Sequence, residues 1–119
     1  MNTLYVIANP LFPNYIKIGH TNNLYSRLKK LSTAVPMAYK VLYKKEYENA
    51  KKIEAHLHAI YRKELHLNLK CVSHEWYPFG EREFFDTVED FLKDIQENIN
   101  WFIKVENTFK DIQKERRKK

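Results

Sequence analysis

Hydrophobic and polar residues follow two periods along this chain, and each period marks a different kind of backbone element. Residues 4–8 and 15–19 are short β-prone runs, and the segment between them is rich in turn-forming residues. These runs predict a β-hairpin. Alternation along the first run places Tyr5 on the face opposite Leu4 and Val6, so the phenol is expected outside the main core.

Helical spacing begins in residues 22–31, where Leu24, Leu28 and Leu31 share one face behind a pair of asparagines that can cap the helix. Residues 39–47 then alternate and are rich in aromatic side chains, which predicts a third strand. The chain is therefore expected to return to the sheet after one short helix.

A second helix is expected after Asn49, which is a capping residue. Its buried side consists of apolar residues spaced about one turn apart, namely Ile53, Leu57, Ile60 and Tyr61. Glu54 and His58 lie one turn apart at the edge of that face. Residues 75–77 leave a further short strand open.

From about Glu83 onward the apolar positions keep a helical period, with Asp86 and Glu89 as a capping box partway along. This pattern indicates one long helix or two shorter ones. The element order predicts an α+β fold, a small α/β sandwich in which helices flank a mainly antiparallel three-stranded sheet and a long helix forms the C-terminus. We divide the chain into a domain at residues 1–95 and a helical extension with a basic tail at residues 96–119.

Length and composition exclude several classes of protein. With 119 residues, 44% of them hydrophobic, the chain fits one core. Apolar runs never approach the roughly 18 residues that span a bilayer, and the first ten residues lack the pattern of a secretion signal, so we expect an intracellular protein without membrane contact. The single cysteine, Cys71, excludes an internal disulfide framework and a thiolate-rich zinc site.

The net charge of +6 is unevenly distributed. Residues 1–70 carry twelve Lys or Arg against four acidic side chains, residues 71–109 carry three against nine, and the last ten carry six against two. Because a polyphosphate responds to local basic surface, the first half and the tail are candidates for nucleic-acid contact. Ordinary solubilising charge is the alternative. The long apolar helix also makes a homodimer through the C-terminal helix an expectation.

Five ordered segments resemble the GIY-YIG nuclease superfamily over about residues 3–91. Thr3-Leu4-Tyr5 and Lys17-Ile18-Gly19 stand where that superfamily carries two tripeptides on neighbouring strands. The others are similar to a variant subfamily of phages, other viruses and bacteria, and comprise residues 16–28, Ile53-Glu54 with Leu57-His58, and Glu75-Trp76-Tyr77. Thr3 in place of glycine and Lys17 in place of tyrosine depart from the superfamily pattern.

The resemblance implies an endonuclease that depends on a divalent metal ion. It implies that Glu54 is the single carboxylate that holds Mg²⁺ or Mn²⁺, with Glu75 as an alternative or additional ligand. It also implies catalytic use of His20, because related enzymes with lysine in the second tripeptide use a neighbouring histidine.

The residue types fit phosphodiester hydrolysis, which needs a base for the attacking water and positive charge at the phosphoryl oxygens. Tyr5 is the expected base, because an ammonium such as Lys17 favours the phenolate of a group whose pKa is otherwise about 10. Arg27, at the margin of the first helix, is expected to hold two phosphate oxygens. The plainer interpretations are a packing tyrosine and a solvated arginine.

The surface that contacts DNA is expected to include basic residues of the first half and one histidine, namely Lys17, Arg27, Lys29, Lys30 and His58. Two other classes of function stay open. One is a DNA-binding module on the same scaffold that lacks catalysis, which the altered tripeptides favour. The other is a protein-interaction or inhibitory domain that works through its long C-terminal helix.

Overall fold

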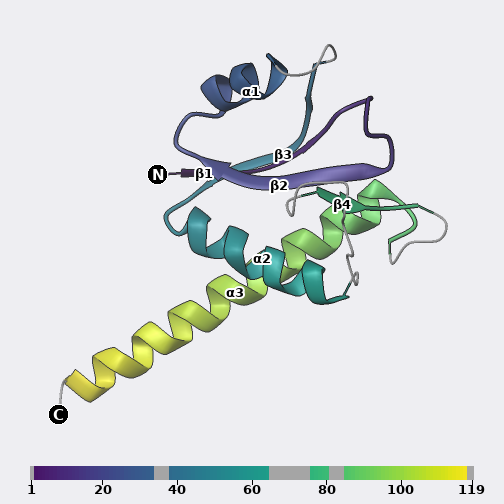
Figure 1. Cartoon of the computed structure of the whole chain (residues 1–119). Coiled ribbons are helices and arrows are strands. Elements are labelled where there is room, and N and C mark those ends of the chain that lie inside the picture. The colour runs from purple at the N-terminus through teal and green to yellow at the C-terminus, as the bar shows by residue number, and fades with distance from the viewer. Residues whose placement is uncertain (1, 34–37, 65–75, 81–84, 118–119) are drawn as a thin grey trace.

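The computed structural model describes residues 2–33, 38–64, 76–80 and 85–117 (Figure 1). In chain order the elements are β1 (Asn2–Ala8), β2 (Tyr15–Thr21), α1 (Leu24–Ser32), β3 (Lys40–Tyr47), α2 (Ala50–Glu64), β4 (Trp76–Pro78) and α3 (Val88–Arg117). The fold is α+β with a long C-terminal helix, as the sequence predicts.

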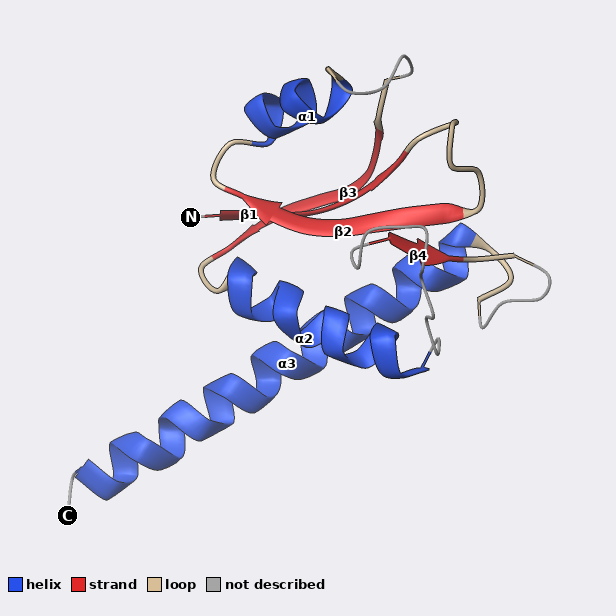
Figure 2. Cartoon of the chain, viewed as in Figure 1, coloured by secondary structure: helices blue, strands red, loops and turns tan. Residues whose placement is uncertain are grey.

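The sheet has four strands rather than the predicted three, in the order β3-β1-β2-β4, and every neighbouring pair is antiparallel (Figure 2). The additional strand is β4, which pairs with residues 15–17 of β2. Successive residues of a strand face opposite sides of the sheet. Trp76 and Tyr77 are both buried, so side chains on both faces of β4 are covered, and this burial stabilises the short strand. Beyond Lys17, the outer edge of β2 has no strand partner among the described residues.

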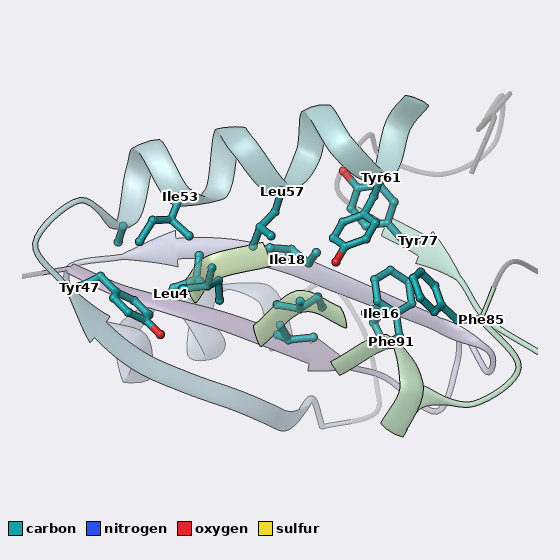
Figure 3. Close-up of a cluster of buried hydrophobic side chains, with 14 residues drawn as sticks. Leu4, Ile16, Ile18, Tyr47, Ile53, Leu57, Tyr61, Tyr77, Phe85 and Phe91 are labelled. Carbon is teal, nitrogen blue, oxygen red and sulfur yellow. The ribbon is translucent and has the colours of Figure 1, made fainter. Parts of the chain in front are cut away.

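The main core lies between one face of the sheet and two helices. α2 and α3 cover this face, whereas α1 lies on the opposite side of the sheet (Figure 2). Core side chains come from all four strands and from α2 and α3, and the largest include Leu4, Ile16, Ile18, Leu57, Tyr61, Tyr77 and Phe91 (Figure 3). Full burial of one such aliphatic or aromatic side chain contributes about 1.5–3 kcal/mol, so this cluster is the main source of hydrophobic stabilisation.

Helix α1 is a polar cover rather than a core helix. Its N-cap is Asn23, whose side-chain oxygen accepts a hydrogen bond from the backbone N–H of Ser26 at 3.1 Å, as the asparagine pair predicts. None of its residues is fully buried, and the apolar positions Leu24, Leu28 and Leu31 are half-buried. The polar side of α1 is therefore open to solvent.

Helix α3 is one continuous helix of 30 residues, and the proposed boundary between residues 95 and 96 lies inside it. Its cap differs from the predicted box at Asp86 and Glu89. The hydroxyl of Thr87 accepts a hydrogen bond from the backbone N–H of Asp90 at 3.1 Å, so α3 begins at Val88, and Glu83, near which the helical pattern starts, lies outside the described residues. Glu106 still contacts Asn49 and Lys52 at the start of α2, and the last turns of α3 extend past α2 and away from the sheet (Figure 1).

Candidate functional site

Four side chains from three elements form a hydrogen-bonded chain on the α2 side of the sheet. The Tyr77 hydroxyl bonds to Nδ1 of His58, and Nε2 of His58 lies 3.2 Å from Oε1 of Glu54. The other carboxylate oxygen of Glu54, Oε2, bonds to Nδ1 of His20. One glutamate on α2 therefore joins a histidine of its own helix to a histidine of β2.

These four hydrogen-bonded side chains lead from the protein interior to the solvent. Tyr77 is fully buried and the His58 side chain is 9% exposed. The exposed fraction then rises to 12% for the Glu54 side chain and 31% for that of His20. His20 is thus the member most open to solvent, and the other three lie behind it.

The surroundings of Glu54 favour its ionised form. Burial of this carboxyl raises its pKa, but the hydrogen bonds and charges of His58 and His20 outweigh burial, and the net pKa is lowered. A carboxylate that accepts bonds from two imidazoles also fixes the orientation of both rings. Glu54 is therefore the centre of the site both geometrically and electrostatically.

Tyr5 approaches the same stretch of β2 from the other face of the sheet. It pairs with Gly19 across the strands, and its hydroxyl occupies the space where a β-carbon on residue 19 would stand. Only glycine leaves that space free. Tyr5 is 3% exposed yet lies outside the core cluster, which confirms the face that strand alternation predicts.

The two faces of β2 therefore bring different groups to neighbouring residues. The Tyr5 hydroxyl lies against Gly19, and the next residue, His20, points to the opposite face and contacts Glu54. Both positions are beyond the part of β2 that β4 covers. The strand backbone separates the phenol from the imidazole at this edge.

Arg27 lies at the start of α1, directly after β2. Together with Lys30 it lines a polar pocket of about 470 Å³, whose other lining residues are Thr21, Asn22, Asn23 and Ser26. Arg27 is exposed on the helix. This pocket borders the end of β2, so a basic surface adjoins the strand that carries Gly19 and His20. Lys29, on the same helix, is also exposed.

Lys17 leans toward β4. Its Nζ lies 6.0 Å from the centroid of the Trp76 ring, which is the cross-strand neighbour of Lys17 on β4. Tyr5 reaches β2 from β1, on the other side of that strand. The predicted influence of Lys17 on the Tyr5 phenol stays a prediction.

Glu54 is the carboxylate of this site that a divalent ion could use. Among the described residues, no group of three His, Cys, Asp or Glu side chains is arranged to hold a metal. A Mg²⁺ ion takes as few as one protein carboxylate and completes its shell with water and phosphate oxygens, and the ionised Glu54 meets that requirement. Glu75, the alternative ligand, lies outside the described residues.

Tyr77 is the member of this site that the sequence interpretation missed as a functional contact. The sequence places it only in a possible short strand and in the segment Glu75-Trp76-Tyr77. A fully buried phenol needs a hydrogen-bond partner, and that requirement was the available signal. The identity of the partner depends on β4 lying beside β2, which places Tyr77 next to α2.

Residues 2–103 match the T5orf172 domain. The chain belongs to the T5orf172 domain family. The match covers every strand, α1, α2 and about half of α3, and it includes all the residues of the site. Comparisons with curated proteins and with solved structures give no match.

The T5orf172 assignment is compatible with a nuclease-like or DNA-binding module. The family region ends within α3, so residues 104–117 continue the helix past the T5orf172 domain. No helix in the described part of the chain has the length and apolar character needed to cross a bilayer.

Proposed function

We propose that this T5orf172 domain is a divalent-metal-dependent endonuclease that hydrolyses DNA phosphodiester bonds at the outer edge of β2. The observation that carries the proposal is the approach of Tyr5 from one face, and of His20 with Glu54 from the other, to adjacent residues of one strand. The family match and the neighbouring basic pocket support a nucleic-acid substrate. The resemblance to GIY-YIG nucleases in segment order supports the same reaction.

The proposed roles are divided among side chains at or near this edge of β2. Arg27 binds phosphate oxygens from the α1 side, with Lys30 and Lys29 adding positive charge. Tyr5 is the proposed base for the attacking water. His20 is a second proton acceptor at the same edge, and Glu54 holds its ring.

Glu54 would hold the Mg²⁺ or Mn²⁺ ion. When bound, such an ion stabilises negative charge on the phosphate and on the leaving oxygen. Because Oε2 of Glu54 bonds to His20, ion binding and the position of the His20 ring are linked through one carboxylate.

Nicking of supercoiled plasmid in Mg²⁺ or Mn²⁺ tests the proposal. Glu54→Gln, Tyr5→Phe and His20→Gln are expected each to lower the rate at least about 100-fold, the usual size of acid–base or electrostatic contributions. Glu106→Gln is the matched control, because Glu106 is a carboxylate on α3 that contacts Asn49 and Lys52 away from β2. Equal rates in the control and in the Glu54 variant would contradict the proposed role of Glu54.

A DNA-binding module without catalysis is the second candidate. The observation that favours it is that both carboxylate oxygens of Glu54 are already engaged by histidines. In that case wild type and all three variants bind DNA alike and none cleaves it. Detectable wild-type nicking that Glu54→Gln abolishes would exclude this candidate.

A further inference from the structure

The surface that carries a further inference is the exposed apolar side of the C-terminal half of α3. Four large side chains there are exposed although they are apolar, namely Trp101 (56%), Val105 (45%), Phe109 (60%) and Ile112 (46%). Trp101, Val105, Thr108 and Ile112 line one shallow groove with Lys104 and Phe109. The opposite side of the helix, with Ile95 and Ile99, faces the domain core. Trp101, at the N-terminal end of the stripe, stacks on His56 of α2, and the rest of the stripe lies on the side of α3 away from the core.

The spacing of the stripe is that of a helix that pairs with another helix. Trp101, Val105, Thr108 and Ile112 are separated by four, three and four residues, which is a seven-residue repeat of alternating positions. The repeat extends past residue 103, where the match to the family ends. A projecting helix with an uncovered apolar stripe is stabilised when a second helix covers it.

We infer that a second copy of this chain covers the stripe, with the two α3 helices antiparallel. In this arrangement Trp101 of one copy packs on Ile112 of the other, and Val105 packs on Thr108. The contact is two-fold symmetric, so one stripe serves both copies. The stripe lies outside the proposed active site, and the inference does not rest on the proposed function.

The charged residues beside the stripe favour a second copy of the chain as the partner and an antiparallel direction of the two helices. Lys104 and Asp111 lie on the same flank of the stripe, seven residues apart, which is about 10 Å along one helix and too far for a pair within the copy. In the antiparallel arrangement Lys104 of each copy faces Asp111 of the other, giving two ion pairs. In a parallel arrangement the same flank meets Phe109 and no ion pair forms. Nucleic acid fits the stripe poorly, since its centre is apolar and Asp111 stands beside it.

Sedimentation equilibrium of the full chain at several concentrations tests the inference, and the wild type is expected to be a dimer. Lys104→Glu or Asp111→Lys alone turns both ion pairs into like-charge contacts and is expected to raise the dimer dissociation constant about tenfold. The double reversal Lys104→Glu with Asp111→Lys restores wild-type affinity, which only residues facing each other across the interface can do. Val105→Asp gives a monomer, whereas Tyr25→Asp, which removes an exposed aromatic residue from α1, leaves the dimer intact.

A wild type that stays monomeric throughout the micromolar range overturns the inference. Single reversals without effect, or a double reversal that fails to restore the dimer, overturn the antiparallel arrangement. Binding of a monomeric chain to anionic phospholipid vesicles, lost in Val105→Asp, assigns the stripe to a membrane surface instead.

Discussion

The phenol of Tyr5 lies over the α-carbon of Gly19 and takes the place of a side chain that residue 19 does not have. The two residues are direct cross-strand partners in β1 and β2. Glycine is needed at this position for space, and Gly19 lies outside the positive-φ region where glycine is needed for backbone freedom. The position of the proposed base is therefore built into the pairing of two strands.

Gly19→Ala is expected to destabilise the protein, because the new methyl group overlaps the ring end of Tyr5 and forces this buried side chain to move. Overpacking of this kind costs roughly 1–3 kcal/mol in the free energy of unfolding. Urea denaturation measures it. Because Cζ of Tyr5 also lies within the overlap, Tyr5→Phe should not relieve the effect, whereas Tyr5→Leu should relieve most of it. Additive effects of Gly19→Ala and Tyr5→Leu would show that the two side chains do not compete for space.

Tyr77→Phe and Tyr61→Phe form a matched pair of variants. Both phenols are fully buried, but Tyr77 bonds to His58 whereas Tyr61 donates to Asp94. Each variant should lose about 1 kcal/mol of stability for each hydrogen bond of its hydroxyl, and the Tyr61 hydroxyl also accepts a bond from Asn98. Only Tyr77→Phe should shift the imidazole ¹⁵N resonances of His58 and lower the nicking rate. Equal effects of the two variants on those resonances would mean that Tyr77 does not position His58.

The lowered pKa of Glu54 predicts a loss of stability in acid. A carboxyl that binds protons less readily in the folded state contributes stability above its ordinary pKa, about 4.5, and this contribution disappears as pH falls through the lower folded pKa. Glu54→Gln cannot titrate, so its stability should fall less steeply below about pH 5. Thermal melts between neutral and acid pH measure this difference. Parallel curves for wild type and variant would contradict the ionised state of Glu54.

His56 predicts a second pH effect in a different range. Its ring stacks on Trp101 and lies 5.0 Å from the ring of Phe102, and burial lowers its pKa. Its Nε2 is buried and has no hydrogen-bond partner among the described residues. Because the folded state resists protonation, stability should be full above the ordinary histidine pKa of about 6.5 and fall below it. His56→Phe keeps a ring in place and should reduce this loss in melts at pH 5 and pH 8.

Arg27→Ala is expected to weaken DNA binding and to reduce its salt dependence. Removing one phosphate contact lowers the slope of log K against log salt concentration by about 0.9 on duplex DNA. Lys52→Ala on α2 removes the same charge from an exposed position and is the control. Fluorescence anisotropy over a range of salt concentrations measures both slopes. An unchanged slope for Arg27→Ala would remove Arg27 from the interface.

Local signals in the sequence predicted much of this fold. Strand alternation placed Tyr5 off the core, and helical spacing placed Glu54 beside His58, because both relationships depend only on residues close in the chain. The contact between His20 and Glu54 was not predicted, because it depends on how α2 crosses β2. The sequence left the fourth strand open, since a three-residue run gains its stability from tertiary burial and not from its own pattern.

The short strand β4 sets a lower limit on the size of any working fragment. Tyr77 belongs at once to the packed interior and to the support of the imidazole behind Glu54. A peptide that stops after α2 keeps every proposed catalytic side chain but lacks the phenol that bonds to His58. A fragment without β4 would therefore lose part of the hydrophobic core and a contact of the proposed active site at the same time.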